Sequence, residues 1–269
     1  MKPKSILLTT LALAGGLLFL SPVLYSVWMA FQTANAYYTG TFEFTLGNFA
    51  LAVGEYNFAR YLVNSVIVSG LVTLIGITFA TMAAFAFARF RFRGGNLLFG
   101  ATVATLMIPS HISLIPNYLT LAKVGLLDSY AGLILPSISS GFAAFFLRQY
   151  IRGIPRALDE AAYMDGATPL KVLWRVIVPI SRPAILSMAL FIFVGEWNNY
   201  IWPLVAVGDS DMYTLQVGLA RLYDINPGEG LIDWPLVMAA STLTILPILL
   251  GFILVERHLV RGITMGAVK

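Results

Sequence analysis

Long stretches without charge are the feature that most restricts how this chain can fold. Six windows contain no Asp, Glu, Lys or Arg, or only one, and each approaches or exceeds the roughly 20 apolar residues that cross a bilayer as a helix. Lipid offers the backbone no hydrogen-bond partners, which favours helices, and no period-2 alternation indicates a β-barrel. The helices are expected at about 6–31, 61–88, 96–120, 129–149, 181–207 and 235–256.

The composition supports a chain that lives in lipid. Hydrophobic residues make up 58% of the 269 residues and charged residues only 11%, whereas soluble domains carry roughly 25% charged residues. A soluble core could not hide this much apolar surface, so we expect an all-α membrane protein with six transmembrane helices. Residues 1–269 are expected to form a single transmembrane domain.

No site for metal or covalent chemistry is evident. The chain has no cysteine, which excludes disulfides and thiolate metal sites. His111 and His258 lie far apart in sequence, and no metal-ligand spacing or nucleophile motif is present. We therefore expect neither a bound metal nor an enzyme active site in this chain.

The first apolar segment has a competing interpretation as a secretory signal peptide. Lys2 and Lys4 precede it, and Ala34-Asn35-Ala36 resembles a cleavage site. A signal peptide has an apolar region of roughly 7–15 residues, and this one, at about 26, is much longer. The length favours a retained transmembrane helix.

The distribution of Lys and Arg predicts the orientation, because cytoplasmic loops are enriched in both. With a cytoplasmic N-terminus, 14 of the 17 basic residues fall inside and only Arg60, Lys123 and Arg221 fall outside. Both termini are then cytoplasmic, in a multi-pass membrane protein. The basic residues are interpreted as orientation signals, so nucleic-acid binding is not expected.

The loop between the fourth and fifth helices, 150–180, is too long for a simple connector. Pro155 suits the start of a short helix, and Gly166 suits the position after its end, where a positive φ is needed. Thr168 and Pro169 are typical of the N-cap and first position of a second helix. Spacing alone leaves two roles open for the first helix: docking to a partner, or lying on the lipid headgroups.

The spacing of the loop residues resembles the EAA loop of ABC importer permeases. Glu160-Ala161-Ala162 is followed by Gly166 and then by Pro179, and only Val176 and Val178 depart from the usual Ile and Leu. Further segments are similar to carbohydrate permeases of the MalG-like, binding-protein-dependent transport family: "NSVIVSG" at 64–70, "IPSHISLIPNYLTLAKVGLLDSYAGLILP" at 108–136, "EWNNYIWPL" at 196–204 and "RGITMGAVK" at the end.

The resemblance implies a type I ABC importer permease of MetI-like fold, in which the 150–180 loop carries a cytoplasmic coupling helix. Such a subunit translocates a sugar or sugar derivative that an extracytoplasmic binding protein delivers. The expected partners are a second permease subunit, in a heterodimer, two copies of an ABC ATPase, the binding protein and membrane lipid. The residues implied in ATPase coupling are Glu160, Ala161, Ala162, Met164, Asp165, Gly166 and Pro179.

ATP and Mg²⁺ are expected in the partner ATPase and not in this chain, which binds no cofactor of its own. The sequence contains no G-x-x-x-x-G-K-[ST] phosphate loop, so it cannot supply the ATPase. The outer loop 206–233 is a candidate platform for the binding protein, and the tail 257–269 a candidate ATPase contact.

A polar and aromatic cluster in the fifth helix is the candidate substrate pathway. Glu196 is the only acidic residue away from the ends of the expected helices, and such residues usually face a bundle interior or a wet cavity. Amide and carboxylate groups beside aromatic rings suit a sugar. The alternatives are a structural or gating role and an interfacial aromatic belt. The candidate residues are Glu196, Trp197, Asn198, Asn199, Tyr200 and Trp202.

Two prolines around a histidine predict a kink in the third helix. Pro109 and Pro116 bracket His111, and each proline removes a backbone hydrogen bond. The kink could shape a gate or serve packing alone.

Two other functions compete with sugar import. A glycerol-3-phosphate permease, or another permease for polyol phosphates or phosphodiesters, would have the same fold. A phosphate favours cationic lining, however, and the expected helices carry no Lys or Arg away from their ends. An ion-coupled secondary transporter would show inverted repeats, and none is evident.

Overall fold

The computed structural model describes residues 3–224 and 232–266. Helices form nearly all of the regular structure in these ranges, and the only β-type pairing there is an isolated bridge between Gln32 and Phe44. The expected all-α class is confirmed. The chain divides into two compact units, 1–62 with 217–247 and 63–216 with 248–269.

The first unit begins with α1 (Pro3–Ala30), whose stretch Leu8–Ala30 is apolar and unburied along its most hydrophobic window. An apolar window that none of the described residues covers is suited to contact with lipid. This unit also contains α2 (Ala34–Thr39), α3 (Gly47–Gly54), the start of α4 (Phe58–Arg89), most of α13 (Leu215–Arg221) and the first part of α14 (Trp234–Gly266). Residues 225–231 of the expected outer platform and 267–269 of the tail lie outside the described residues.

The second unit holds the core and both candidate sites. Its helices after α4 are α5 (Gly95–Ala104), α6 (Leu114–Lys123), α7 (Tyr130–Ile134), α8 (Gly141–Arg152), α9 (Ala157–Met164), α10 (Pro169–Val172), α11 (Val178–Trp197) and α12 (Ile201–Ala206). Small residues of α4 and α8, among them Ala84 and Ala143, are fully buried in this core. Small side chains let two helix backbones approach closely, which stabilises helix pairs in membranes.

Within the described residues, four helices are long and apolar enough to cross a membrane, and two bent pairs raise the number to six if each pair is one span. The bends measure 91° between Gly95–Met107 and His111–Lys123, and 46° between Tyr130–Ser137 and Gly141–Arg152. If each bent pair is one span, the spans follow the same order along the chain as the expected windows. The expected kink is present, because the backbone leaves the helical conformation at Ile108 and Pro109.

The helix around residue 190 differs from the expected 181–207. It runs without a break from Pro169 to Trp197 and includes a π-helical turn at Leu173–Ile177. Local π turns compensate for the backbone donor that a proline such as Pro179 removes. The expected second short helix of the loop is therefore continuous with the transmembrane helix.

The same helix also ends earlier than expected. α11 stops at Trp197, and α12 begins at Ile201, so Pro203 lies in the first turn of a new helix. Proline is tolerated in a first turn, whereas inside an unbroken helix its ring would clash with the carbonyl of Asn199. Glu196 and Pro203 therefore lie on two different helices.

Candidate functional site

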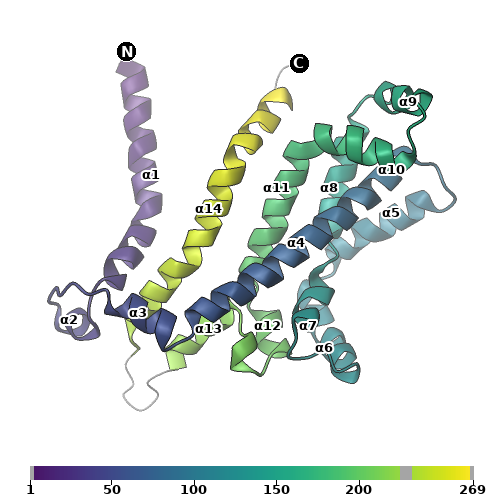
Figure 1. The fold of residues 1–269 in the computed structure, drawn as a ribbon. Helices are drawn as coiled ribbons and strands as arrows, with labels where there is room; N and C mark the ends of the chain where they lie inside the picture. The colour runs from purple at the N-terminus through teal and green to yellow at the C-terminus, as the bar shows by residue number, and fades with distance from the viewer. Residues whose placement is uncertain (1–2, 225–231, 267–269) are drawn as a thin grey trace. The chain divides into compact units, whose positions relative to one another are not determined.

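The loop between α8 and α11 folds into a short helix, a glycine turn and the start of a long helix. α9 begins at Ala157 after Arg156, two residues later than expected, because Pro155 lies in the preceding turn and its carbonyl accepts the Leu158 N–H. Figure 1 shows α9 at one end of the second unit, beyond the ends of α4 and α11. The loop therefore projects from the helices that it connects.

Gly166 ends α9 in the left-handed conformation that was expected of it. Its φ is 75°, and the N–H groups of Gly166 and Ala167 donate to the carbonyls of Tyr163 and Ala162. This pattern satisfies the last carbonyls of a helix and reverses the chain, and glycine adopts the required φ without a steric penalty. Thr168 is the N-cap of the next helix, as expected, although its side chain makes no capping bond, and Pro169 follows in the first turn.

Most of α9 is open to solvent. Met164 is 88% exposed, and Leu158 and Tyr163 are 43% and 40% exposed. The other predicted coupling residues are also exposed, except Ala162, which is half-buried against the core: Glu160, Ala161, Asp165, Gly166 and Pro179. Exposed apolar side chains on a protruding helix are typical of an interaction surface.

Asp159 is the exception on α9, since it is buried and holds the helix to α4. Its Oδ2 lies 2.5 Å from Nε of Arg89, and the two side chains are only 7% and 5% exposed. Arg89 also donates from Nη2 to the Ile154 carbonyl at 3.0 Å. Burial raises the pKa of the Asp159 carboxyl, and the adjacent Arg89 guanidinium opposes this rise. Arg89 therefore contacts both the segment that precedes α9, at Ile154, and α9 itself, at Asp159.

None of the sequence patterns above identifies this pair. Arg89 is one of the basic residues that indicate orientation, and Asp159 precedes the Glu160 of the EAA motif without belonging to it. A sequence feature that could have indicated the pair is the presence of an acid in the loop, Asp159, and a cationic residue at the end of a transmembrane helix, Arg89. A cavity of about 300 Å³ lies beside the pair and is lined by Arg89, Phe90, Arg156, Asp159, Glu160, Tyr163 and Pro169.

The predicted pathway residues lie at the break between α11 and α12. Asn199 donates from Nδ2 to the half-buried Glu196 carboxylate at 3.3 Å, and Ser137 provides a second side-chain hydrogen bond to it. Asn198 is exposed and donates to the Val194 carbonyl at 2.8 Å. The amides of Asn198 and Asn199, in the break, therefore lie near a carboxylate in the last turn of α11.

The aromatic residues of this cluster separate into two groups. Trp197 is 1% exposed and stacks on Phe193, with ring centroids 5.5 Å apart. Trp202 is 7% exposed, and its indole N–H donates to the Gly132 carbonyl at 3.2 Å. Tyr200, in contrast, is 38% exposed. In this conformation Tyr200 is the accessible ring, and the two tryptophans pack in the interior.

The three kink residues lie at the bend that joins α5 to α6. Pro109 precedes a 3-10 turn, Ser110–Ser113, that contains His111. Pro116 lies in the first turn of α6, where its carbonyl accepts the Thr120 hydroxyl at 2.7 Å. His111 is exposed, so it does not hold the bend together by packing.

Comparison with known proteins identifies the family that this chain matches. The model of the "binding-protein-dependent transport system inner membrane component" family matches residues 73–265. An arabinooligosaccharides transport system permease protein, AraQ, of Halalkalibacterium halodurans is 35% identical over 77% of this chain and 72% of the relative. An sn-glycerol-3-phosphate transport system permease protein, UgpE, of Shigella flexneri is 37% identical over 77% of this chain and 73% of the relative.

Solved structures show the same fold. A chain of a bacterial ABC transporter involved in the import of the acidic polysaccharide alginate has a TM-score of 0.82 at 23% identity, covering 94% of this chain and 95% of that chain.

Among the described residues, no three His, Cys, Asp or Glu side chains gather as a metal site. The chain belongs to the binding-protein-dependent transport system inner membrane components, a family of membrane permeases with the fold of an ABC importer subunit.

Proposed function

We propose that this chain is the transmembrane permease subunit of an ATP-driven importer for a sugar or sugar derivative. The observation that carries the proposal is α9, a capped and exposed helix joined to α4 by the Arg89–Asp159 pair. Relatives named for arabinooligosaccharide and glycerol-3-phosphate transport support an import function.

In this proposal, α9 is the coupling helix, and its exposed face docks into a separate ABC ATPase. Glu160, Ala161 and Met164 make the contact, because they are the exposed motif residues on α9. Movement of the ATPase then moves α9, and the buried ion pair transmits that movement to α4. The ATPase binds ATP and Mg²⁺, since this chain contains no phosphate loop.

The remaining partners and the topology follow the same proposal. Residues 1–269 form one permease domain with both termini in the bacterial cytoplasm. A second permease subunit completes the translocation pathway, and an extracytoplasmic binding protein delivers the substrate. A related alginate importer has been solved with a substrate-bound periplasmic protein, which supports this arrangement.

The break after α11 is proposed as part of the substrate pathway. Glu196, Asn198 and Asn199 offer acceptors and donors to sugar hydroxyls, and Tyr200 offers an exposed ring to a sugar C–H face. Trp197 and Trp202 then support the pathway from the interior. The bend at Pro109, His111 and Pro116 is a second candidate element of this pathway, as a gate.

Glycerol-3-phosphate is the second candidate substrate, because a relative named for its transport is as similar as the one named for arabinooligosaccharides. The two substrates differ in charge. No Lys or Arg side chain occurs between Glu196 and Ala206, so the polar groups at the break favour neutral hydroxyls over a phosphate.

The test uses the complete transporter, purified with its own ATPase and binding protein and reconstituted in vesicles. Neutral oligosaccharides and glycerol-3-phosphate are titrated separately, and both ATP hydrolysis and uptake are measured. We expect oligosaccharides to stimulate both, and we expect Glu160→Lys and Gly166→Val to hydrolyse ATP without matching uptake. Normal coupling in both variants would overturn the coupling role, and stimulation by glycerol-3-phosphate alone would overturn the sugar assignment.

A further inference from the structure

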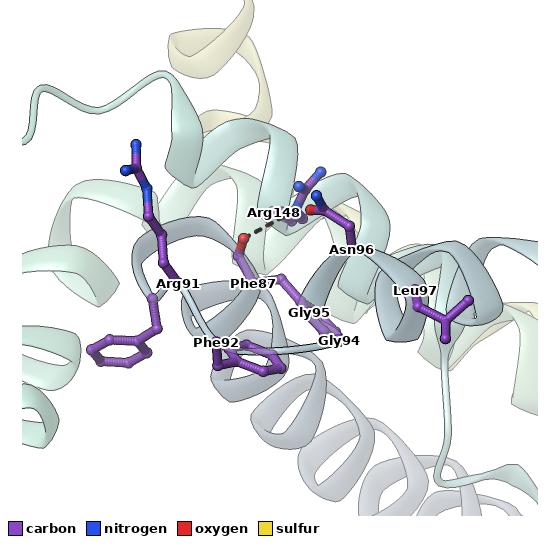
Figure 2. Close-up of a pocket in the computed structure, with 9 residues that line it drawn as sticks. Phe87, Arg91, Phe92, Gly94, Gly95, Asn96, Leu97 and Arg148 are labelled. Carbon is purple, nitrogen blue, oxygen red and sulfur yellow. Dashed lines mark hydrogen bonds between the residues drawn. The ribbon is translucent and has the colours of Figure 1, made fainter.

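A cavity distinct from the one beside the Arg89–Asp159 pair lies at the turn between α4 and α5, and the two share only Phe90 among their lining residues. It has a volume of about 360 Å³ and is lined by Phe87, Phe90, Arg91, Phe92, Gly94, Gly95, Asn96, Leu97 and Arg148 (Figure 2). Two of the nine lining residues are arginines and none is acidic, so the cavity carries positive charge.

The polar groups of this cavity are available to a ligand. Arg148 is held in place, because its Nε donates to the Phe87 carbonyl at 3.2 Å and its guanidinium lies 3.7 Å from the centre of the Phe99 ring. Its Nη groups remain available. Arg91 and Asn96 make no side-chain hydrogen bond or ion pair with the described residues. In Figure 2 the ends of Arg91, Asn96 and Arg148 point to the same side of the cavity.

The position of the cavity in the chain indicates which environment a ligand there would meet. Residues 90–94 connect two helices that are both part of candidate membrane spans, so this turn lies at a membrane–water interface. Leu97 and Leu98, on the first turn of α5, are 78% and 55% exposed, which suits them to contact with the acyl chains of a lipid. A ligand here meets guanidinium groups and a hydrocarbon environment together.

We propose that this cavity binds the phosphodiester group of an anionic phospholipid, with Arg91 and Arg148 as its cationic partners. Guanidinium groups match phosphate oxygens in charge and fork geometry, and basic pockets between membrane helices are suited to lipid headgroups. No side chain caps the start of α5 beside the cavity, and in its first turn the N–H groups of Asn96 and Leu97 donate to none of the described residues and are available to an anion. The exposed leucines distinguish a lipid from free phosphate.

The test is native mass spectrometry of the full chain in detergent, titrated with phosphatidylglycerol, phosphatidylcholine or inorganic phosphate. Arg91→Gln should weaken phosphatidylglycerol binding about tenfold, as expected for the loss of one charge-assisted contact. Arg93→Gln is the matched control, because Arg93 lies in the same turn, carries the same charge and does not line the cavity. It should leave binding unchanged.

A second variant separates loss of lipid binding from loss of the folded structure. Arg148→Lys keeps the charge and loses the fork, so it should also weaken phosphatidylglycerol binding while the thermal unfolding midpoint confirms a folded chain. Equal losses in Arg91→Gln and Arg93→Gln would show diffuse charge attraction and overturn the proposal. Equal affinity for phosphatidylcholine, or displacement of the lipid by equimolar inorganic phosphate, would overturn it as well.

Discussion

Arg89 and Asp159 show how much one buried pair of side chains can decide. Each is nearly inaccessible to solvent, and each would be costly to bury alone because its charge would lose its hydration. Together they connect a solvent-exposed helix to the transmembrane core, 70 residues apart in sequence. Their partnership restricts where α9 can lie relative to α4.

Removal of one partner should destabilise the chain strongly. Asp159→Asn is expected to lower the free energy of unfolding by about 3–5 kcal/mol, because Arg89 would be left buried without a counter-charge. Asp165→Asn is the control, since Asp165 is an exposed acid in the same loop. Unfolding in detergent with increasing denaturant measures both, and equal effects would contradict the assignment.

Replacement of both partners separates stability from coupling. The double variant Arg89→Met with Asp159→Leu should recover much of the lost unfolding free energy, because paired apolar groups need no counter-charge. If the ion pair transmits movement only by holding α9 to α4, uptake per ATP should recover in parallel. Restored stability with uptake still uncoupled would show that the charges themselves take part.

Glu196 should affect transport and not assembly. Glu196→Gln keeps the shape of the side chain and removes its charge, so hydrogen bonds from sugar hydroxyls become weaker. We expect the affinity for the substrate to fall about tenfold. We expect uptake at low substrate concentration to fall while basal ATP hydrolysis is unchanged. Glu55→Gln, at an exposed acid outside the break, is the comparison, and equal loss in both would argue against a pathway role.

At the scale of elements, the loop from α8 to α11 is built from local signals that act in sequence. Pro155 leads into α9, Gly166 ends it with a φ of 75°, and Pro169 starts the next helix. These residues need only their own neighbours to act, which is why the sequence predicts them. The continuation of α10 into α11 depends on the π turn before Pro179, which no local signal announced.

A side chain at Gly166 should destabilise the loop because of the backbone conformation there, and not because space is lacking. A Cβ at Gly166 would meet nothing within 4 Å, so Gly166→Ala tests the positive φ alone. We expect a loss of about 1 kcal/mol in unfolding free energy and a lower ratio of uptake to ATP hydrolysis. Gly100→Ala, also in open space but without a positive φ, should be neutral or slightly stabilising.

At the scale of the whole molecule, the absence of cysteine allows a direct test of topology. Single cysteines at two exposed positions, Asp165→Cys and Asp209→Cys, can be labelled with a membrane-impermeant maleimide in intact cells and after permeabilisation. The excess of basic residues in the 150–180 loop predicts that Asp209→Cys reacts in intact cells and Asp165→Cys only after permeabilisation. The reverse pattern would invert the proposed orientation.

The sequence by itself determined the all-α membrane class, the order of the spans and the helix–glycine–helix loop, because these depend on hydrophobicity and turn chemistry within a few residues. The tertiary structure alone decided that Asp159 meets Arg89, that Trp197 and Trp202 pack inside while Tyr200 remains accessible, and that Arg91 and Arg148 line one cavity. Each of these depends on residues distant in sequence or on how helices are buried. Local patterns do not encode such contacts, since they form only when helices pack against one another.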